Sequence, residues 1–433
     1  MFVSGKERIM KMVTNNQLGI SRAKAPLHIG LVALLVVVLW SQTALAQPCG
    51  ITQITNGDTF GAIIQTNNAS INADGTRIAF HLDADLTGAN ADRNVEIFLF
   101  DSNTNTITQV TNTTSGPAPT NHAPSINADG TRIAFESTAD LTGGNPELNR
   151  EIFLYDSTAG TFTQLTENAG IGQAYLPSIN ADGTRIAFES NANPTGENPN
   201  GNSEIYLIDM TDSTITQVTN SPATIGSFNA AINADGTYVA FDSDENLTGG
   251  NPDFNREIFL FNIAGNTTTQ LTNSTGSGDN VGNFAPSINA NGTRIAFHSN
   301  RDLTGGNADS NTEIFLFDTT AGTLTQITIS TEGAPLLENR FTAINADGTI
   351  IVFVSGRNLS GNNPDNTLEI FSFNTTTKAF TQVTNTTAGD SVTPSVNADG
   401  TRIAFISRAD QTGDNSDGFD ELFLASCGAP AAQ

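Results

Sequence analysis

The chain alternates short apolar runs with turn-forming polar residues, and one such pattern occurs seven times. Its first copy is Ser-Ile-Asn-Ala-Asp-Gly-Thr-Arg-Ile-Ala-Phe at Ser70–Phe80. The other copies begin near residues 125, 178, 231, 287, 343 and 395. Asp-Gly lies between two apolar runs and supplies the positive φ angles of a tight hairpin turn. Each copy therefore predicts two antiparallel strands joined by that turn.

Two further motifs follow the hairpins and make up the rest of the repeating unit. The first is Glu-Ile-Phe-Leu-Phe-Asp, as at Glu96–Asp101, and the second is Thr-x-Thr-Gln-[Val/Leu/Ile]-Thr, as at Thr106–Thr111. Side chains alternate between the faces of a strand, so the run Ile-Phe-Leu-Phe places apolar residues on both faces. Each unit therefore predicts four short strands in a sheet that is covered on both sides.

Seven such units predict an all-β fold, a seven-bladed β-propeller of four-stranded antiparallel blades. The Thr-x-Thr-Gln motif follows the first six units and is missing after the seventh. A matching segment, Ile51–Thr55, lies instead near the start of the chain. We therefore expect the N-terminal strand to complete the last blade, which closes the ring and leaves no free sheet edge.

A segment with the features of a secretory signal precedes the propeller, which is expected over residues 47–433. Basic residues come before the apolar run Ile29–Trp40, and Ala44-Leu45-Ala46 follows it. This order predicts a signal peptide over residues 1–46 that is cut before Gln47. A retained membrane anchor is the alternative, but the run is short for a bilayer. The mature protein is expected to be periplasmic or secreted.

The chain is strongly acidic, with a formal net charge of −26. Residues 1–46 contain five Lys or Arg and one acidic residue, so the predicted mature chain keeps 13 basic and 43 acidic residues, a charge of −30. Such a field disfavours nucleic acid and anionic membrane surfaces as partners. We expect a monomer that does not span a membrane and that binds a protein, a peptide or a glycan. Solubility alone also explains an acidic surface.

The two cysteines flank the expected ring closure. Cys49 precedes the N-terminal strand, and Cys427 follows the last strand of the seventh unit. Aligned with the second unit, they correspond to Gly160 and Ser157, the two ends of a four-residue turn. The α-carbons of such ends lie within about 7 Å, which suits a disulfide. We therefore predict a Cys49–Cys427 bond, with two free thiols as the alternative.

The long loops carry a second repeat, Asp/Asn-Leu-Thr-Gly-x-Asn-x-Asp-x-Asn-x-Glu. Positions two apart in an extended segment face the same way, so three oxygen-bearing side chains converge, as Ca²⁺ requires. In the alternative, which the near-identical copies favour, Asn and Asp form turns while the Glu caps backbone N–H groups or pairs with the repeat arginine. The candidate calcium ligands are Asp92, Asn94 and Glu96 in the first unit, Asp253, Asn255 and Glu257 in the fourth, and Asp309, Asn311 and Glu313 in the fifth.

Three histidines remain in the predicted mature chain: His81, His122 and His298. They are candidate ligands of a transition metal or candidate acid–base groups, and solvated strand-end residues are the alternative. His81 and His298 occupy matching positions of units one and five, which are not neighbours in a ring. The sequence contains no Gly-x-Ser-x-Gly, His-Glu-x-x-His or Cys-x-x-Cys motif and no phosphate-binding glycine loop, so no catalytic residue is assigned.

The unit Pro-Ser-Ile-Asn-Ala-Asp-Gly-Thr-Arg-Ile-Ala-Phe, with Glu-Ile-Phe-Leu-Tyr-Asp and Thr-Gln-Leu-Thr, resembles the TolB-type or WD-like propeller repeat from Ile51 to about Cys427. The usual Trp of that repeat's first strand is Ile here, as at Ile71, and the usual Pro before Asp-Gly is Ala. The resemblance implies a propeller in the cell envelope or outside the cell. It does not extend to the additional N-terminal domain of TolB or to the hydrolase domain of prolyl oligopeptidase relatives.

Two functions remain open from the sequence. The favoured one is an exported, non-catalytic propeller that binds a protein, a peptide or a glycan through its loop-rich face, because the repeats are uniform and no polar cluster is unique. The alternative is a metal-dependent propeller lyase or hydrolase that acts on a polysaccharide. Oligogalacturonate lyases, which are similar to this repeat family, use a histidine-held metal, and here that function requires His81, His122 and His298 to converge.

Overall fold

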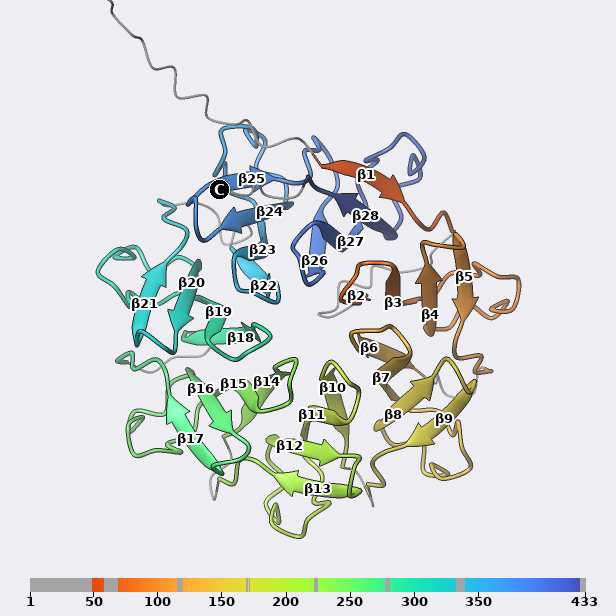
Figure 1. Ribbon diagram of the computed structural model, residues 1–433, viewed down its shortest axis with the longest axis horizontal. Coiled ribbons are helices and arrows are strands. Elements are labelled where there is room, and N and C mark those ends of the chain that lie inside the picture. The colour runs from red at the N-terminus through yellow and green to blue at the C-terminus, as the bar shows by residue number, and fades with distance from the viewer. Residues whose placement is uncertain are drawn as a thin grey trace, which may run out of the picture. The chain divides into compact units, whose positions relative to one another are not determined.

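The computed structural model describes residues 49–57, 69–114, 120–168, 170, 172–221, 225–276, 281–331 and 339–428. Every regular element in these ranges is a β-strand, and the strands form seven four-stranded antiparallel sheets (Figure 1). The predicted seven-bladed propeller is confirmed. The predicted signal peptide at residues 1–46 lies outside the described ranges. None of the described residues belongs to a helix that could cross a membrane.

Each blade follows the chain outward from the centre of the ring, so its first strand lies innermost (Figure 1). Blade 1 comprises β2 (Ala69–Ile71), β3 (Arg77–Leu82), β4 (Glu96–Asp101) and β5 (Thr106–Gln109). Blade 2 comprises β6 (Asn121–Ile126), β7 (Arg132–Ser137), β8 (Glu151–Asp156) and β9 (Thr161–Gln164). Blade 3 comprises β10 (Ala174–Ile179), β11 (Arg185–Ser190), β12 (Glu204–Asp209) and β13 (Thr214–Gln217). Blade 4 comprises β14 (Ser227–Ile232), β15 (Tyr238–Ser243), β16 (Glu257–Asn262) and β17 (Thr267–Gln270).

The remaining blades follow the same order. Blade 5 comprises β18 (Asn283–Ile288), β19 (Arg294–Ser299), β20 (Glu313–Asp318) and β21 (Thr323–Gln326). Blade 6 comprises β22 (Arg340–Ile344), β23 (Ile350–Ser355), β24 (Glu369–Asn374) and β25 (Phe380–Gln382). Blade 7 comprises β26 (Ser391–Val396), β27 (Arg402–Ser407) and β28 (Glu421–Ser426), with β1 (Gly50–Gln53) as its outer strand.

The ring closes as the sequence predicted. Strand β1 pairs antiparallel with β28, from Gly50 opposite Ser426 to Gln53 opposite Phe423. Cys49 and Cys427 form a disulfide with their α-carbons 4.1 Å apart, so the predicted bond is confirmed. The disulfide takes the place of the turn that joins the third and fourth strands in the other blades. The two ends of the propeller are thus held by a sheet and by a covalent link.

The hairpin turns differ in one detail from the expectation. Gly75 N donates to Asn72 O at 3.1 Å, and Gly75 has φ +74°, whereas Asp74 is not among the residues with positive φ. Asp74 instead accepts hydrogen bonds from the N–H and hydroxyl groups of Thr76. The connection is therefore a longer, four-residue loop in which only the glycine needs the left-handed region.

Both faces of each blade are buried, because every blade packs between two others. In β4, Phe98 and Phe100 belong to a core cluster with residues of blade 7, while Ile97 and Leu99 pack against blade 2. Phenylalanines of neighbouring strands stack inside each blade, as Phe80 does on Phe98 with ring centroids 5.4 Å apart. The alternating apolar pattern of the sequence therefore translates directly into these layers.

The repeat residues also join consecutive blades. Ser70 Oγ accepts a hydrogen bond from Ile126 N of the next blade at 3.2 Å, and Arg77 donates to Gly130 O of that blade. Ala73 N donates to Ala128 O at 3.1 Å, one link in a chain of similar bonds around the narrow end of the channel. The motif that predicts the hairpin is thus also the contact that orients one blade on the next.

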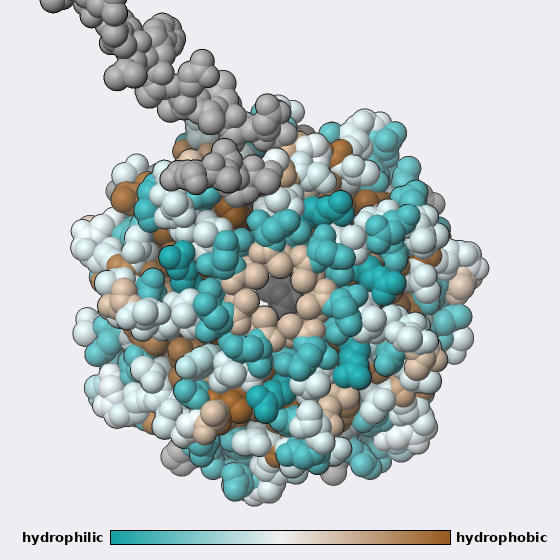
Figure 2. Space-filling model, viewed as in Figure 1, coloured by the Kyte–Doolittle hydropathy of each residue, from teal (hydrophilic) through white to brown (hydrophobic). Residues whose placement is uncertain are grey.

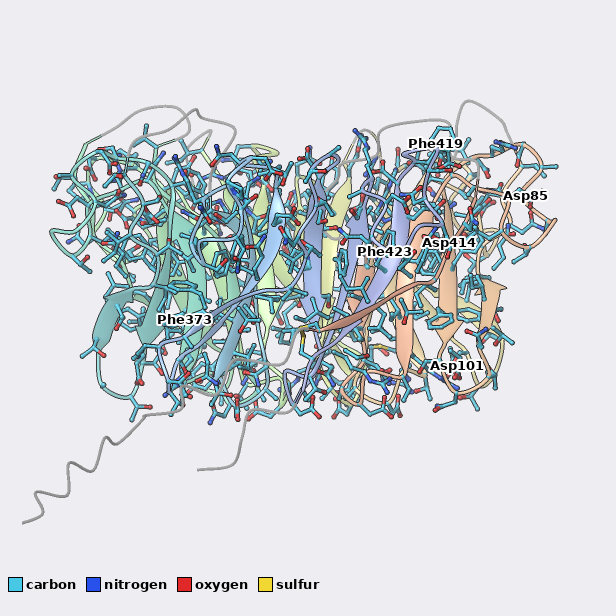
Figure 3. All side chains as sticks on the ribbon, turned by 90° about the horizontal axis from the view of Figure 1, so that it is seen from above. Asp85, Asp101, Phe373, Asp414, Phe419 and Phe423 are labelled. Carbon is cyan, nitrogen blue, oxygen red and sulfur yellow. A yellow bond between two sulfur atoms is a disulfide. The ribbon has the colours of Figure 1, made fainter. Side chains whose placement is uncertain are left out.

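The two ends of the propeller differ in their loops. Asp85 and Phe419, in the long connections between second and third strands, lie on one face, and Asp101, at the end of β4, lies toward the other (Figure 3). The long loops thus share one face, as expected, and the Asp-Gly turns share the opposite one. We call the first the loop-rich face.

Candidate functional site

A channel runs through the centre of the ring, and its opening is visible in Figure 2. Its larger cavity has a volume of about 280 Å³ and is lined by the first strands of the blades, including Ser125, Pro177 and Asn229. A second cavity of about 200 Å³ lies at the end with the Asp-Gly turns and is lined by Ile and Ala residues of the same strands. Small side chains line much of this wall.

The wall of the larger cavity contains a repeated backbone irregularity. The first strand of each of blades 2 to 7 shifts its register against the second strand, which marks a β-bulge. One non-glycine residue of each bulge has a positive φ, a conformation that costs free energy for a residue with a side chain. These residues are Ala123, Leu176, Asn229, Ala285, Phe341 and Thr393.

In three of these bulges, a backbone N–H group donates a hydrogen bond to a buried carboxylate. Leu176 N donates to Glu136 Oε2 at 2.8 Å, Asn229 N donates to Glu189 Oε2 at 3.2 Å, and Ala285 N donates to Asp242 Oδ1 at 3.0 Å. In each case the carboxylate lies on the second strand of one blade and the N–H group on the first strand of the next. His81 and His298 occupy the same strand position in blades 1 and 5.

Two arginines accompany the carboxylates. Arg150 forms an ion pair with Glu136 and lies over the ring of Tyr175. Arg256 forms ion pairs with Asp242 at 3.2 Å and with Asp244 at 2.7 Å. We use the name polar arc for His81, His122, Glu136, Arg150, Glu189, Asp242, Arg256 and His298. The polar arc lies directly behind the channel wall in blades 1 to 5.

Burial shifts the pKa values of several side chains in the polar arc. Burial raises the pKa of Glu189 to about 7, and it raises that of Asp242 to about 6 despite the opposing effect of Arg256. Burial also lowers the pKa of His122 to about 4 and that of His298 to about 4. Near neutral pH the arc therefore contains neutral imidazoles together with a carboxyl group that is close to its midpoint.

These shifts predict that the protein loses stability as the pH rises above 6.5. Burial raises the pKa of Glu189 and of Glu421 to about 7, from the ordinary value of 4.5. The folded protein therefore binds these two protons more tightly than the unfolded chain does, and this contribution to the free energy of unfolding is lost as the pH rises through the folded pKa. The lowered histidine pKa values act in the opposite direction, but only below 6.5. We expect the melting temperature to fall between pH 6.5 and about 8, and to fall less in Glu189→Gln. Thermal melting across buffers checks this, and a rise over that interval would contradict it.

The structure brings two of the three predicted histidines together. The rings of His81 and His122 meet edge to face with centroids 5.0 Å apart. His81 is 1% exposed, and neither of its ring nitrogens has a hydrogen-bond partner; the same holds for Nδ1 of His122. His298 lies on β19 in blade 5 and stacks on Phe284 instead. The fold therefore does not bring all three histidines together.

The His81–His122 pair supplies only part of a metal site. Its unpartnered nitrogens are suited to a transition metal, since a neutral imidazole is the form that ligates. Glu136 lies opposite His122 across the β6–β7 pair, but its two oxygens already bind Arg150 and Leu176 N. Within the described ranges no three His, Cys, Asp or Glu side chains are placed to hold one ion. The residues present do not form a complete ligand set.

The loop acids predicted as calcium ligands have structural partners. Glu96 Oε1 accepts from the N–H and hydroxyl groups of Thr113, and Oε2 accepts from Thr111 and Asn121. Asn94 Nδ2 donates to Thr113 O at 2.7 Å. Glu257, Glu313, Asn255 and Asn311 make the matching bonds in blades 4 and 5, Asp253 accepts from Gly276 N, and Asp309 accepts from Asn311. The glutamates thus act as caps, and calcium binding by these loops stays a prediction.

The sequence contains a signal for the polar arc. The residue after the repeat's final Phe is His81, Glu136, Glu189, Asp242, His298, Val354 or Ile406, so this position varies more than most others in the repeat. Variation at one inward position of a repeat marks a site where the blades differ. The meeting of His81 with His122 could not be found in this way, because it depends on how blade 2 packs on blade 1.

No family model and no curated protein sequence matches the chain. Among solved structures, an oligogalacturonate lyase from Vibrio parahaemolyticus has a TM-score of 0.59 at 14% identity, over 87% of this chain and 93% of that one. An oligogalacturonate lyase in complex with manganese has a TM-score of 0.57 at 15% identity, over 89% and 94%. A TolB structure from Agrobacterium tumefaciens has a TM-score of 0.43 at 15% identity, over 76% and 96%. The propeller fold that the TolB-type resemblance implies is shared by the two lyase structures.

The expectation of a non-catalytic scaffold is wrong on these findings. The two lyase structures share the fold over most of their length, and the fold is what identities of 14% and 15% show. The expectation also rested on the lack of a unique polar cluster, whereas His81 and His122 are in contact. The enzyme alternative is therefore the one that the findings favour.

Proposed function

We propose that this propeller is an enzyme that cleaves a polysaccharide, as a lyase or a hydrolase, at the channel mouth of blades 1 and 2. The observation that carries the proposal is the His81–His122 pair, two buried neutral imidazoles with unpartnered nitrogens behind the channel wall. The likeness to lyase propellers supports it. A metal-dependent reaction needs at least one ligand beyond these two imidazoles.

The pair can supply acid–base chemistry to a sugar that reaches it past the channel wall, since neither histidine lines the cavity itself. A neutral imidazole accepts a proton at one nitrogen and donates one from the other, so His81 and His122 can exchange a proton without meeting an opposing charge. Arg150, held by Glu136, is the nearest cation of the arc and would stabilise negative charge that develops on the substrate. The net charge of −26 disfavours a polyanionic substrate and favours a neutral polysaccharide.

Activity assays on matched histidine variants test the proposal. The purified protein is incubated with a neutral glucan, chitosan and polygalacturonate, and both new reducing ends and unsaturated products are measured. We expect cleavage of at least one polysaccharide, with a loss of about 10²–10⁴-fold in His81→Ala and in His122→Ala. His298→Ala is the control, because it removes a buried imidazole from the same strand position in blade 5. No turnover on this panel, or equal losses in all three variants, would count against it.

We also propose that the enzyme acts outside the cytoplasm. The Cys49–Cys427 disulfide supports this, since such bonds persist in oxidising compartments. The basic and apolar order of residues 1–46 supports it from the sequence. N-terminal sequencing of the protein recovered from the periplasm or the medium checks it, with Gln47 as the expected first residue.

A further inference from the structure

Blade 6 has an arginine at a position where the three preceding blades have aromatic residues. Arg340, in β22, occupies the strand position of Tyr175, Phe228 and Phe284 in blades 3, 4 and 5. Its guanidinium carbon lies 5.0 Å from the ring centroid of Phe341, and its Nε is buried without a hydrogen-bond partner. Among the residues that the structure describes, no acidic side chain forms an ion pair with Arg340. A half-buried cation therefore lies near the channel wall without an anionic partner.

Two arginines of the polar arc show what is missing at this place. Arg150 pairs with Glu136, and Arg256 pairs with Asp242. Each of these carboxylates lies on a second strand and also accepts a bulge N–H group of the next blade. In blade 5 the same strand position is His298. Burial and the neighbouring arginine of blade 6 lower the pKa of His298 to about 4, so the imidazole is uncharged at neutral pH. The interface between blades 5 and 6 thus has a cation and lacks the carboxylate.

The guanidinium group faces the imidazole across this interface. Thr342 Oγ1 donates to Ala296 O at 3.4 Å, which fixes β22 against β19. Two residues farther along each strand, toward the loop-rich face, are Arg340 and His298. The histidine contact between blades 1 and 2 occupies the equivalent place, with ring centroids 5.0 Å apart. Because the blades repeat the same packing, Arg340 and His298 are the matching pair between blades 5 and 6.

The outer nitrogen atoms of this pair are open to a ligand. Both side chains are half-buried, and only their inner nitrogens, Nδ1 of His298 and Nε of Arg340, are enclosed without a partner. Nε2 of His298 and the Nη atoms of Arg340 are not enclosed, and within the described ranges no residue accepts a hydrogen bond from them. The pair therefore presents unused N–H donors to the solvent.

These donors match a carboxylate group. A guanidinium binds the two oxygens of a carboxylate through parallel hydrogen bonds, and an imidazole N–H adds a further donor. Carboxylate side chains occupy the strand position of His298 at the three preceding interfaces, as Glu136, Glu189 and Asp242. We propose that His298 and Arg340 bind one small carboxylate anion between blades 5 and 6. The anion would supply the negative charge that protein side chains supply to the arginines of blades 2 and 4.

The overall charge of the protein limits the strength of this site. A net charge of −26 repels anions over long distances, so binding depends on the local guanidinium and its neighbouring N–H group. We therefore expect weak but saturable binding, in the millimolar range. The proposal is independent of polysaccharide cleavage, because that activity is assigned to the histidine pair of blades 1 and 2.

Titration of the purified protein with isotope-labelled acetate, at neutral pH and low salt, tests the site. The NMR line width of acetate reports binding, and the melting temperature reports the stability that binding adds. We expect one saturable site. Arg340→Tyr should weaken binding about 10-fold or more, and it should fold because Tyr175 occupies the equivalent position. Lys378→Gln removes an exposed cation of the same blade and should bind like the original protein.

A second substitution supplies the carboxylate from the protein itself. His298→Asp places an acid at the strand position that Asp242 occupies in blade 4. The introduced carboxylate should pair with Arg340, as Asp242 pairs with Arg256. We expect this variant to exclude acetate and to melt at a higher temperature than the original protein. A variant that had merely lost its fold would melt at a lower temperature instead.

The outcomes decide for or against the site. Absence of saturable acetate binding would overturn the proposal, and so would binding that Arg340→Tyr or His298→Asp leaves unchanged. Chloride that binds as well as acetate would also overturn it, because a site for a carboxylate prefers two oxygens to a single spherical ion. Loss of binding in both variants, with Lys378→Gln unchanged, would support it. Polysaccharide cleavage by the same samples is measured separately, so failure of one proposal does not imply failure of the other.

Discussion

Removal of the Cys49–Cys427 disulfide is expected to cost about 4–5 kcal/mol of unfolding free energy. The bond joins residues 378 positions apart and restricts the unfolded chain over almost the whole propeller. Without it, the N-terminal segment is held to the seventh blade by the four-residue pairing of β1 with β28 and by hydrogen bonds of Ile54, Thr55 and Gly57 to Glu421 and Leu422. Separation of this segment exposes the edge of β28 and opens the ring. Urea denaturation of the oxidised protein and of Cys49→Ser/Cys427→Ser measures the difference.

The double serine variant also provides the control for reductant. A reducing agent should destabilise the original protein and leave Cys49→Ser/Cys427→Ser unchanged, because the variant has no bond to break. Equal stability of the oxidised and reduced proteins would contradict the prediction. It would mean that the β1–β28 ladder and the core around it close the ring unaided.

The second large effect is expected for Arg256→Ala, which should cost about 3–5 kcal/mol. Arg256 pairs with Asp242, whose side chain is fully buried, and also with Asp244. It lies over the ring of Phe228 as well, with 4.2 Å from the guanidinium carbon to the ring centroid. Without Arg256, Asp242 stays buried with Asn229 Nδ2 and Ala285 N as donors but with no cation. Chemical denaturation at neutral pH checks the size of the loss.

A second substitution separates charge from packing. Arg256→Ala/Asp242→Asn removes both charges and keeps an oxygen that can accept from Ala285 N, so part of the lost stability should return. If the double variant is no more stable than Arg256→Ala, the loss comes from packing on Phe228 rather than from the unpaired carboxylate. A cost below about 1 kcal/mol for Arg256→Ala would show that the pair behaves like an exposed one.

The sequence by itself determined the architecture and its closure. The repeat with Asp-Gly between apolar runs, the two-sided strand Glu-Ile-Phe-Leu-Phe-Asp and the displaced Thr-x-Thr-Gln segment each report local preferences of backbone and side chain. Local preferences that agree in seven copies leave one consistent topology. The disulfide followed for the same reason, because Cys49 and Cys427 occupy the two ends of a turn that the other units show in full. Within this architecture, only the φ angle of Asp74 in the hairpin loop differs from the expectation, because it is not positive.

The tertiary structure alone decided which polar groups meet. His81 and His122 lie on different blades, and Glu136 meets Leu176 N across another blade interface. Such contacts depend on the register between sheets, on which the period of the repeat carries no information. The glutamates of the loops show the same limit, since spacing placed Glu96 near Asn94 but could not reveal that Thr111, Thr113 and Asn121 already satisfy its oxygens. A sequence pattern determines which face of its strand a side chain occupies. The packing of neighbouring blades determines which residues that side chain contacts.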